Sequence, residues 1–481
     1  MLEIINKNKL FLFIIIILVG TIIRLYQINF NDFWSDEMVS FWIADPNIEF
    51  KETIIRIFSS NWMVLYEILL KYFHYFFGYN VDTSRYFSLI ISIASLISFA
   101  LLLKKTTNEN AAIFGLFILS INIYHLGFSI ELRSYILSFF LVCVFIYYCF
   151  SNISNNNSIN ILMLNLFSIL MLLSHAFTLL VVGSYVVYLF LKILKSKTII
   201  NKDLYKIVSL IVSSTLFLIF YFQTTIKIID PSIFKGISPD WMWQIKASFY
   251  TNFYFSKFFG SRILGLIHLV VLLVCIFYYK KKIYKDFDIF TFFIILIFFS
   301  YFIPLIYGYI FNPILLDRYI FFILIPIIGL LAHLIFQVKN KKIRIFLILL
   351  ICLSSFLNNL LYENSFRKFY TSIYPSKPEV KKALNNINKS NIKFYTFKED
   401  NRYSINTNLI IQNYLLKCEE KLNLKLKYIP FDNKDLMPEK LWVIYLKDTI
   451  DTDFSIPKKL SKYKLLQEKF FNRLELYLLA K

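Results

Sequence analysis

The stretch from residue 10 to residue 37 reads LFLFIIIILVGTIIRLYQINFNDFWSDE and joins two very different compositions. Its first part, residues 10–28, is almost entirely apolar, and a helix of that length crosses the hydrocarbon core of a bilayer. The segment lacks a small-residue cleavage site, so we predict a membrane helix rather than a cleavable signal peptide. The polar residues NDFWSDE then lie just beyond the membrane boundary.

The rest of the chain extends this pattern. Of its 481 residues, 58% are hydrophobic and 17% are charged, and the mean hydropathy is +0.59, which excludes an ordinary soluble globular protein. Residues 361–481 nevertheless hold 23 Lys and Arg and 14 Asp and Glu. We therefore predict a membrane-embedded domain at residues 1–360 and a water-soluble domain at residues 361–481.

Eleven apolar runs predict about eleven transmembrane helices. They are residues 10–28, 85–103, 110–127, 132–150, 158–174, 176–194, 205–223, 260–279, 288–311, 315–337 and 343–360. Clusters of Lys and Arg follow the second, sixth, eighth and tenth runs, and basic loops face the cytoplasm. We predict a multi-pass protein of the cell membrane, inner or plasma, with a cytoplasmic N-terminus and an extracytoplasmic C-terminal domain. Orientation thus accounts for much of the net charge of +21, and nucleic acid is not an expected partner.

The C-terminal residues alternate helical and extended patterns. The sequence predicts helices at 379–387 and 409–418 and strands at 392–397, 424–429, 441–446 and 465–479. The expected fold class is a polytopic α-helical membrane protein with a small extracytoplasmic α/β domain. A phosphate-binding loop and paired cysteines are absent from the sequence, so ATP-driven transport, a zinc site and a disulfide scaffold lack support.

The densest polar cluster opens the first outer loop, predicted at residues 29–84. Asp36 and Glu37 are adjacent carboxylates close to Trp34, at the depth of the lipid headgroups. A carboxylate there can serve as general base beside a lipid-linked substrate. The alternative is an acidic, solvated loop with no chemical role.

Further polar residues fall on the same side of the membrane. Arg133 lies in the segment ELRSY at 131–135, and its planar guanidinium suits a phosphate, whereas the alternative is snorkelling at a helix end. His175, Arg318 and Arg85 also begin or join apolar runs there. Alternatively, His175 is an interfacial histidine with its hydrogen bonds satisfied, Arg318 forms an ion pair with Asp317 that anchors a helix end, and Arg85 only marks a helix end. Because the centres of the runs are nearly free of charge, the shared location favours an outward-facing membrane enzyme with a lipid-borne substrate over a transporter.

The order of the motifs resembles the protein O-mannosyltransferase superfamily (glycosyltransferase family 39), which includes lipid A aminoarabinose transferases. The motifs are WSDE at 34–37, LYEILL at 65–70, FFG at 76–78, SRYFS at 84–88, ELRSY at 131–135, SH at 174–175, and RY at 318–319 with Pro326. The resemblance covers about residues 10–340. It departs at residues 62–64, WMV, where His-Pro-Pro is usual, and at Phe87, where proline is usual.

The resemblance implies the GT-C fold, an extracytoplasmic active site and a sugar donor on polyprenyl phosphate. As a mechanistic hypothesis, we predict that Asp36 accepts the proton of an acceptor hydroxyl, with inversion at the sugar, while Glu37 holds Asp36 or the acceptor. Because the leaving phosphate needs positive charge, the candidate phosphate ligands are Arg133 and Arg318, helped by Lys71 or Arg85. The candidate pocket residues are Trp34, Glu131, Tyr135, His175 and Tyr319.

The resemblance leaves three matters open. Some GT-C enzymes use a divalent cation, although the sequence offers no clear ligand set. The acceptor is a cell-envelope glycan, lipid or protein. Alternative functions are a polysaccharide or lipid-linked oligosaccharide flippase, an O-antigen polymerase or ligase, and a non-catalytic scaffold.

Overall fold

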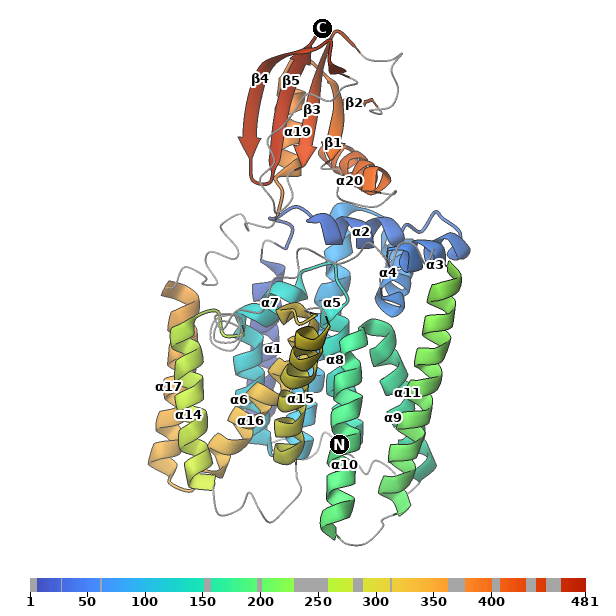
Figure 1. The fold of residues 1–481 in the computed structure, drawn as a ribbon. Helices are drawn as coiled ribbons and strands as arrows, with labels where there is room; N and C mark the ends of the chain where they lie inside the picture. The colour runs from blue at the N-terminus through green and yellow to red at the C-terminus, as the bar shows by residue number, and fades with distance from the viewer. Residues whose placement is uncertain are drawn as a thin grey trace. The chain divides into compact units, whose positions relative to one another are not determined.

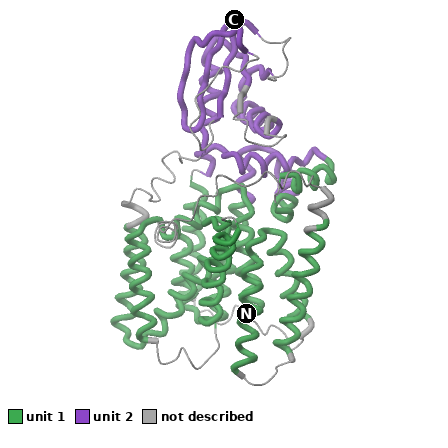
Figure 2. Tube along the Cα trace, viewed as in Figure 1, with its two compact units in different colours: residues 1–26, 49–69, 88–367 green, residues 27–48, 70–87, 368–481 purple. Residues whose placement is uncertain are grey.

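Two compact units make up the computed structural model (Figure 2). Unit 1 comprises residues 1–26, 49–69 and 88–367, and unit 2 comprises residues 27–48, 70–87 and 368–481. Two parts of the predicted first outer loop thus belong with the C-terminal residues, whereas the predicted domain limits at 360 and 361 stay a prediction. The structure describes residues 7–26, 28–60, 63–150, 157–196, 201–228, 258–279, 289–311, 314–361, 377–399, 407–429, 438–446 and 460–481.

Unit 1 is built of helices (Figure 1). They are α1 (Lys7–Leu25), α3 (Phe50–Ser59), α6 (Glu109–Ile121), α7 (Ile123–Ser129), α8 (Tyr135–Cys149), α9 (Asn157–Ser174), η1 (Ala176–Thr178), α10 (Leu179–Ser196), α11 (Asn201–Ile228), α14 (Arg262–Tyr279), α15 (Ile289–Ile310), η3 (Asp317–Ile323), α16 (Leu324–Gln337) and α17 (Lys341–Leu361). Two more helices, α4 (Val64–Phe77) and α5 (Val81–Thr106), carry residues of both units.

Each of the eleven predicted spans falls on one helix or on a consecutive pair. Within the described residues, six helical segments are long and apolar enough to cross a membrane, and α6 with α7 is a seventh candidate bent by 66°. Shorter apolar helices occupy Tyr135–Cys149, Ile159–Ser174 and Arg262–Tyr278. The chain is therefore a multi-pass membrane protein, while the count of eleven and the orientation stay predictions.

Helix α16 is the most deeply buried of these spans. It contacts α6, α14, α15 and α17, and glycines allow close packing between α16 and α15 and between α6 and α5. A Cβ atom on Gly329 of α16 would lie 2.5 Å from the Phe293 ring of α15. A Cβ atom on Gly115 of α6 would lie 2.4 Å from Leu103, so small residues set this packing as they do in other membrane bundles.

The break between α6 and α7 is stabilised by Arg24 of α1, which is fully buried. Its guanidinium donates to the carbonyl of Ser120 at 3.0 Å and to Nδ1 of His125 at 2.8 Å. Asn122 caps α7 by accepting from the His125 amide at 2.9 Å. Backbone groups released by a break in a membrane need such partners, and the apolar run 110–127 gave no sign of the break.

Unit 2 contains a five-stranded mixed sheet in the order β2-β1-β3-β5-β4. Its elements are α2 (Ser35–Ile43), α19 (Val380–Lys389), β1 (Phe394–Glu399), α20 (Thr407–Leu422), β2 (Lys427–Tyr428), β3 (Lys440–Leu446), β4 (Lys464–Phe471) and β5 (Leu474–Ala480). Strand β1 pairs in parallel with β2 and β3, whereas β5 pairs antiparallel with β3 and β4. Both predicted helices and the predicted α/β class of this part are confirmed.

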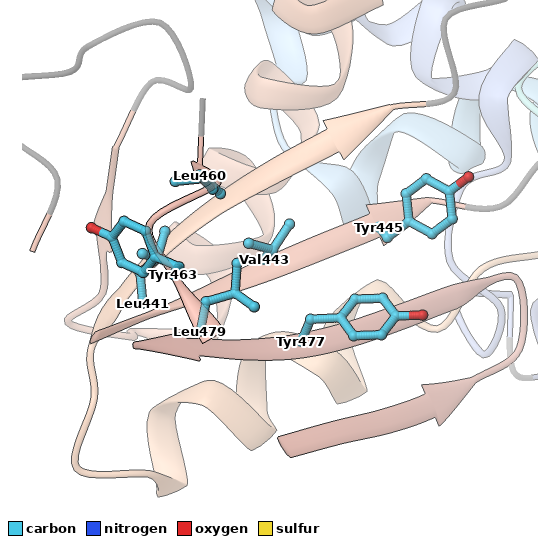
Figure 3. Packing of buried hydrophobic residues seen from close by; sticks show 7 residues of the cluster. All are labelled: Leu441, Val443, Tyr445, Leu460, Tyr463, Tyr477 and Leu479. Atoms are coloured by element: carbon cyan, nitrogen blue, oxygen red, sulfur yellow. The ribbon is translucent and has the colours of Figure 1, made fainter. Parts of the chain in front are cut away.

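The central strand β3 reads KLWVIYL and is buried on both faces. Alternate side chains of β3 and β5 meet Leu460 and Tyr463 in one apolar cluster, which Figure 3 shows. On the opposite face of β3, the Trp442 indole donates to Ser390 at 3.1 Å, directly after α19. A continuous apolar run is typical of a strand covered on both sides.

One strand prediction is wrong. Residues 465–479 form not one strand but the hairpin of β4 and β5, which turns at Asn472 and Arg473. Arg473 adopts a φ of 50°, a conformation that most side chains avoid and that glycine or asparagine usually supplies. Asn472 is the one turn residue within the run, and because Arg473 rather than glycine or asparagine holds the positive φ, the pattern did not indicate a hairpin.

Candidate functional site

The predicted aspartate and glutamate begin helix α2 in unit 2. Both lie in its first turn, where the positive end of the helix dipole favours carboxylates. The Glu37 side chain also accepts from the Trp34 amide at 3.4 Å. Neighbouring positions on a helix point about 100° apart, and here Glu37 is fully buried whereas Asp36 is partly exposed.

Two cations hold the buried Glu37 carboxylate. Arg85 makes a forked pair with it, from Nε to Oε1 at 3.1 Å and from Nη2 to Oε2 at 3.0 Å. Lys377 adds a contact from Nζ to Oε2 at 2.6 Å. Burial alone would raise the pKa of Glu37, but the charges and hydrogen bonds of Arg85 and Lys377 lower it to about 2. Glu37 is therefore a charged anchor within unit 2 and a poor proton acceptor.

Arg85 is occupied by the same segment. Besides its two bonds to Glu37, it donates to the carbonyls of Ile28, Asn31 and Asp32, at 3.1, 2.6 and 3.3 Å. Five N–H groups are all that an arginine has. The predicted contact of Arg85 with phosphate stays a prediction, and this geometry favours an internal role for the side chain.

Lys71 is likewise turned toward the backbone. It lies on α4, is 8% exposed, and donates to the carbonyls of Asp45 and Ile48 at 2.6 and 2.8 Å. These carbonyls follow the end of α2, where a cation is favourable. The structure thus places Lys71 as a support of the first-loop backbone, and its predicted phosphate contact also stays a prediction.

Unit 1 brings together a second group of the predicted residues. Arg133 and Tyr135 come from the start of α8, His175 from the start of η1, and Arg318 and Tyr319 from the start of η3. The His175 ring lies 5.6 Å from the Tyr135 ring and 5.3 Å from the Tyr319 ring, between centroids. Each arginine covers its neighbouring tyrosine ring, at 5.5 Å for Arg133 and 5.6 Å for Arg318. We call these five residues the cationic cluster.

The electrostatics of the cationic cluster suit an anion. Burial lowers the pKa of His175, and the positive charges of Arg133 and Arg318 lower it further, to about 3. His175 is therefore neutral at physiological pH, while Arg133 and Arg318 are each partly exposed as residues. Helix α8 also begins at Tyr135 of this cluster, where the positive end of a helix favours an anion, and η3 contacts both α8 and η1. Asp317 turns back, its Oδ1 accepting from the Arg318 amide at 3.0 Å.

Glu131 is fixed near this cluster through its backbone. Its carbonyl accepts from the Ser88 hydroxyl at 2.6 Å, and Tyr66 shares that hydroxyl at 2.7 Å. This holds the segment before α8 against α5. The role predicted for the Glu131 side chain in the pocket stays a prediction.

The sequence did not indicate the C-terminal residues that hold the first loop. Lys381 pairs with Asp32 at 3.1 Å, and the Tyr414 hydroxyl accepts from the Phe33 amide at 2.9 Å. Lys377 and Glu37 lie 340 positions apart. Such pairs have no local spacing pattern, so no motif could have found them. For a metal, no group of three or more His, Cys, Asp or Glu side chains was found among the residues that the structure describes.

Known proteins resemble this chain in structure and not in sequence. Neither a protein-family model nor a curated protein sequence matches it. Its structure is similar to that of ArnT from Cupriavidus metallidurans in the apo state, with a TM-score of 0.56 and 11% sequence identity over 98% of both chains. ArnT bound to undecaprenyl phosphate matches with a TM-score of 0.55 and 10% identity, again over 98% of both.

An oligosaccharyltransferase from Archaeoglobus fulgidus, tethered to an acceptor peptide, is similar over 91% of this chain and 69% of its own length. The TM-score is 0.51 and the identity 11%. The chain has the GT-C fold. At such low identity the likeness establishes the fold alone, and it confirms the fold expected from the sequence motifs.

Proposed function

We propose that this GT-C chain transfers a sugar from a polyprenyl-phosphate donor to an acceptor hydroxyl on the extracytoplasmic face of the membrane. The observation that carries the proposal is the cationic cluster, because two partly exposed arginines around a neutral histidine suit a phosphate. The similarity to ArnT bound to undecaprenyl phosphate supports the same class of ligand.

In the proposed reaction, the acceptor oxygen attacks the anomeric carbon while its proton passes to the carboxylate of Asp36. The bond from this carbon to the phosphate oxygen breaks, and polyprenyl phosphate leaves as an anion. Direct displacement inverts the anomeric centre. The leaving group needs positive charge and no proton, a task we assign to Arg133 and Arg318.

The two adjacent carboxylates are assigned different roles because they differ in burial. Asp36 is partly exposed and can meet an acceptor, whereas Glu37 is enclosed and held by Arg85 and Lys377. We therefore assign proton transfer to Asp36 alone. Glu37, which the sequence also suggested as catalytic, takes the part of holding the start of α2.

A donor assay tests the proposal. Purified protein meets a panel of undecaprenyl-phosphate sugars (aminoarabinose, mannose, glucose and galactose) with a crude cell-envelope acceptor, and mass spectrometry detects released undecaprenyl phosphate. We expect release by the wild type and a loss of about 10²–10⁴-fold in Asp36→Asn, the range for a general base. Asp45→Asn, a second partly exposed aspartate of unit 2, is the matched control and should retain release.

Two results would count against the proposal. Full activity of a folded Asp36→Asn protein removes this residue from the base role. No release by the wild type with any donor, under conditions where its thermal unfolding is cooperative, rejects the donor class and favours a transporter.

A further inference from the structure

Unit 2 fastens the Asp36 segment to the C-terminal residues at several points. The Lys381 amide donates to Asp32 Oδ2 at 2.9 Å, close to the start of α19. The Phe33 ring stacks on Tyr414 of α20, with centroids 5.1 Å apart. Helix α2 also contacts α20 (Figure 1). The segment that carries the proposed base is thus built into the C-terminal fold.

Of the two C-terminal lysines that contact this segment, Lys377 is more enclosed than Lys381. Its side chain is 8% exposed, and its ammonium group lies 5.5 Å from the centroid of the Trp34 ring as well as on Glu37. Its carbonyl accepts from the Asn472 side chain at 2.6 Å, in the turn between β4 and β5. Lys377 therefore joins the β4–β5 hairpin to the two residues that flank Ser35 and Asp36.

The energetics indicate a role in geometry. Burying an ion pair costs about as much desolvation as its attraction returns, so an apolar substitute of the same volume would stabilise the fold equally well. The charged arrangement adds a defined orientation, because hydrogen bonds from a forked arginine and a lysine hold the Glu37 carboxylate in one position. With Glu37 fixed, the first turn of α2 and the adjacent Asp36 are fixed too.

We propose that Lys377 is a positioning residue that sets the orientation of Asp36 through Glu37, so that the C-terminal residues form part of the catalytic unit. The inference rests on the proposed function, in which Asp36 is the base. According to this inference, residues 377–481 influence the turnover rate and do not merely cover the rest of the chain.

The test compares full-length Lys377→Met, Lys377→Arg and a control, Lys389→Met, an exposed lysine in the last turn of α19. In Lys377→Met we expect kcat, with the undecaprenyl-phosphate sugar that the wild type uses, to fall about 10–100-fold, as a displaced catalytic group predicts. The KM for that donor should change less than about twofold, because the substitution acts on the orientation of Asp36 and leaves Arg133 and Arg318 unchanged. Lys377→Arg should recover most of the rate, and Lys389→Met should equal the wild type.

Hydrogen exchange gives a readout that needs no substrate. We expect the amides of α2, including that of Met38, which donates to the Trp34 carbonyl at 3.0 Å, to exchange about tenfold faster in Lys377→Met. The inference is overturned if a folded Lys377→Met protein has the same kcat as the wild type, or the same hydrogen-exchange rates in α2. If the wild type releases no undecaprenyl phosphate, the proposed function fails, and exchange alone then decides whether Lys377 orders α2.

Discussion

Replacing Glu37 by glutamine tests the buried ion pairs of unit 2. The change keeps the shape of the side chain and leaves Arg85 and Lys377 buried without their anion. The pKa of Glu37 is about 2, below its ordinary value of 4.5. Since one pKa unit corresponds to about 1.4 kcal/mol, the carboxylate contributes about 3 kcal/mol at pH 7. This agrees with the roughly 3–5 kcal/mol lost when one partner of a buried pair is removed.

The pH dependence of this contribution has a definite sign. Because the pKa of Glu37 is lower in the folded state, the unfolded chain takes up the proton first, so the contribution is complete above about pH 5. It declines as the pH falls toward the folded pKa of about 2, and less than half of it remains at pH 3.

Thermal unfolding of detergent-solubilised protein between pH 7 and pH 3 measures both effects. One kcal/mol shifts the Tm of a unit of this size by about 2–4 °C. We expect Glu37→Gln to lower the Tm by on the order of 10 °C at pH 7, and by less than half of that at pH 3. Glu420→Gln, whose side chain is 69% exposed, is the control and should shift the Tm by about 1 °C or less. A Tm difference that stays constant over this pH range would refute the lowered pKa of Glu37.

Three further predictions concern single substitutions. Arg318→Ala should lower kcat/KM for the lipid donor about 10–100-fold, mainly through a higher KM, because a hydrogen bond to a charged group is lost. An unchanged kcat/KM would make Arg318 a helix anchor. Gly329→Ala should destabilise unit 1 by about 1–3 kcal/mol, since its Cβ would meet the Phe293 ring at 2.5 Å, and a Tm equal to the wild type would show that the ring moves freely. Arg473→Gly should stabilise unit 2 by about 1 kcal/mol by relieving the φ of 50°, and a lower Tm would mean that contacts of the arginine outweigh this strain.

Periodicity and composition predicted the parts of the fold that depend on neighbours in sequence. The apolar runs became helices, and the patterns at 379–387 and 409–418 became α19 and α20. The hairpin turn at Arg473 was missed because its strained residue is one that turns rarely use. The bend after Ile121 was missed because the polar partners that permit it, chiefly Arg24, come from another helix.

The candidate site divides in the same way. The sequence could nominate Arg133, His175 and Arg318, since each begins an apolar run at one predicted face of the membrane. It could not show that the partners of Glu37 leave Asp36 as the more accessible carboxylate. That distinction depends on burial, which two adjacent acidic letters do not reveal.

The long separation between Glu37 and Lys377 also bears on biosynthesis. The ribosome adds Glu37 early in synthesis and Lys377 340 residues later, after the intervening apolar helices have been made. At about 5–20 residues per second, that interval lasts roughly 17–68 s. During it, the α2 segment lacks the C-terminal half of its fold. A nascent chain stalled within this interval should therefore expose this segment to proteases or chaperones, which makes synthesis of the C-terminal residues the step that completes maturation.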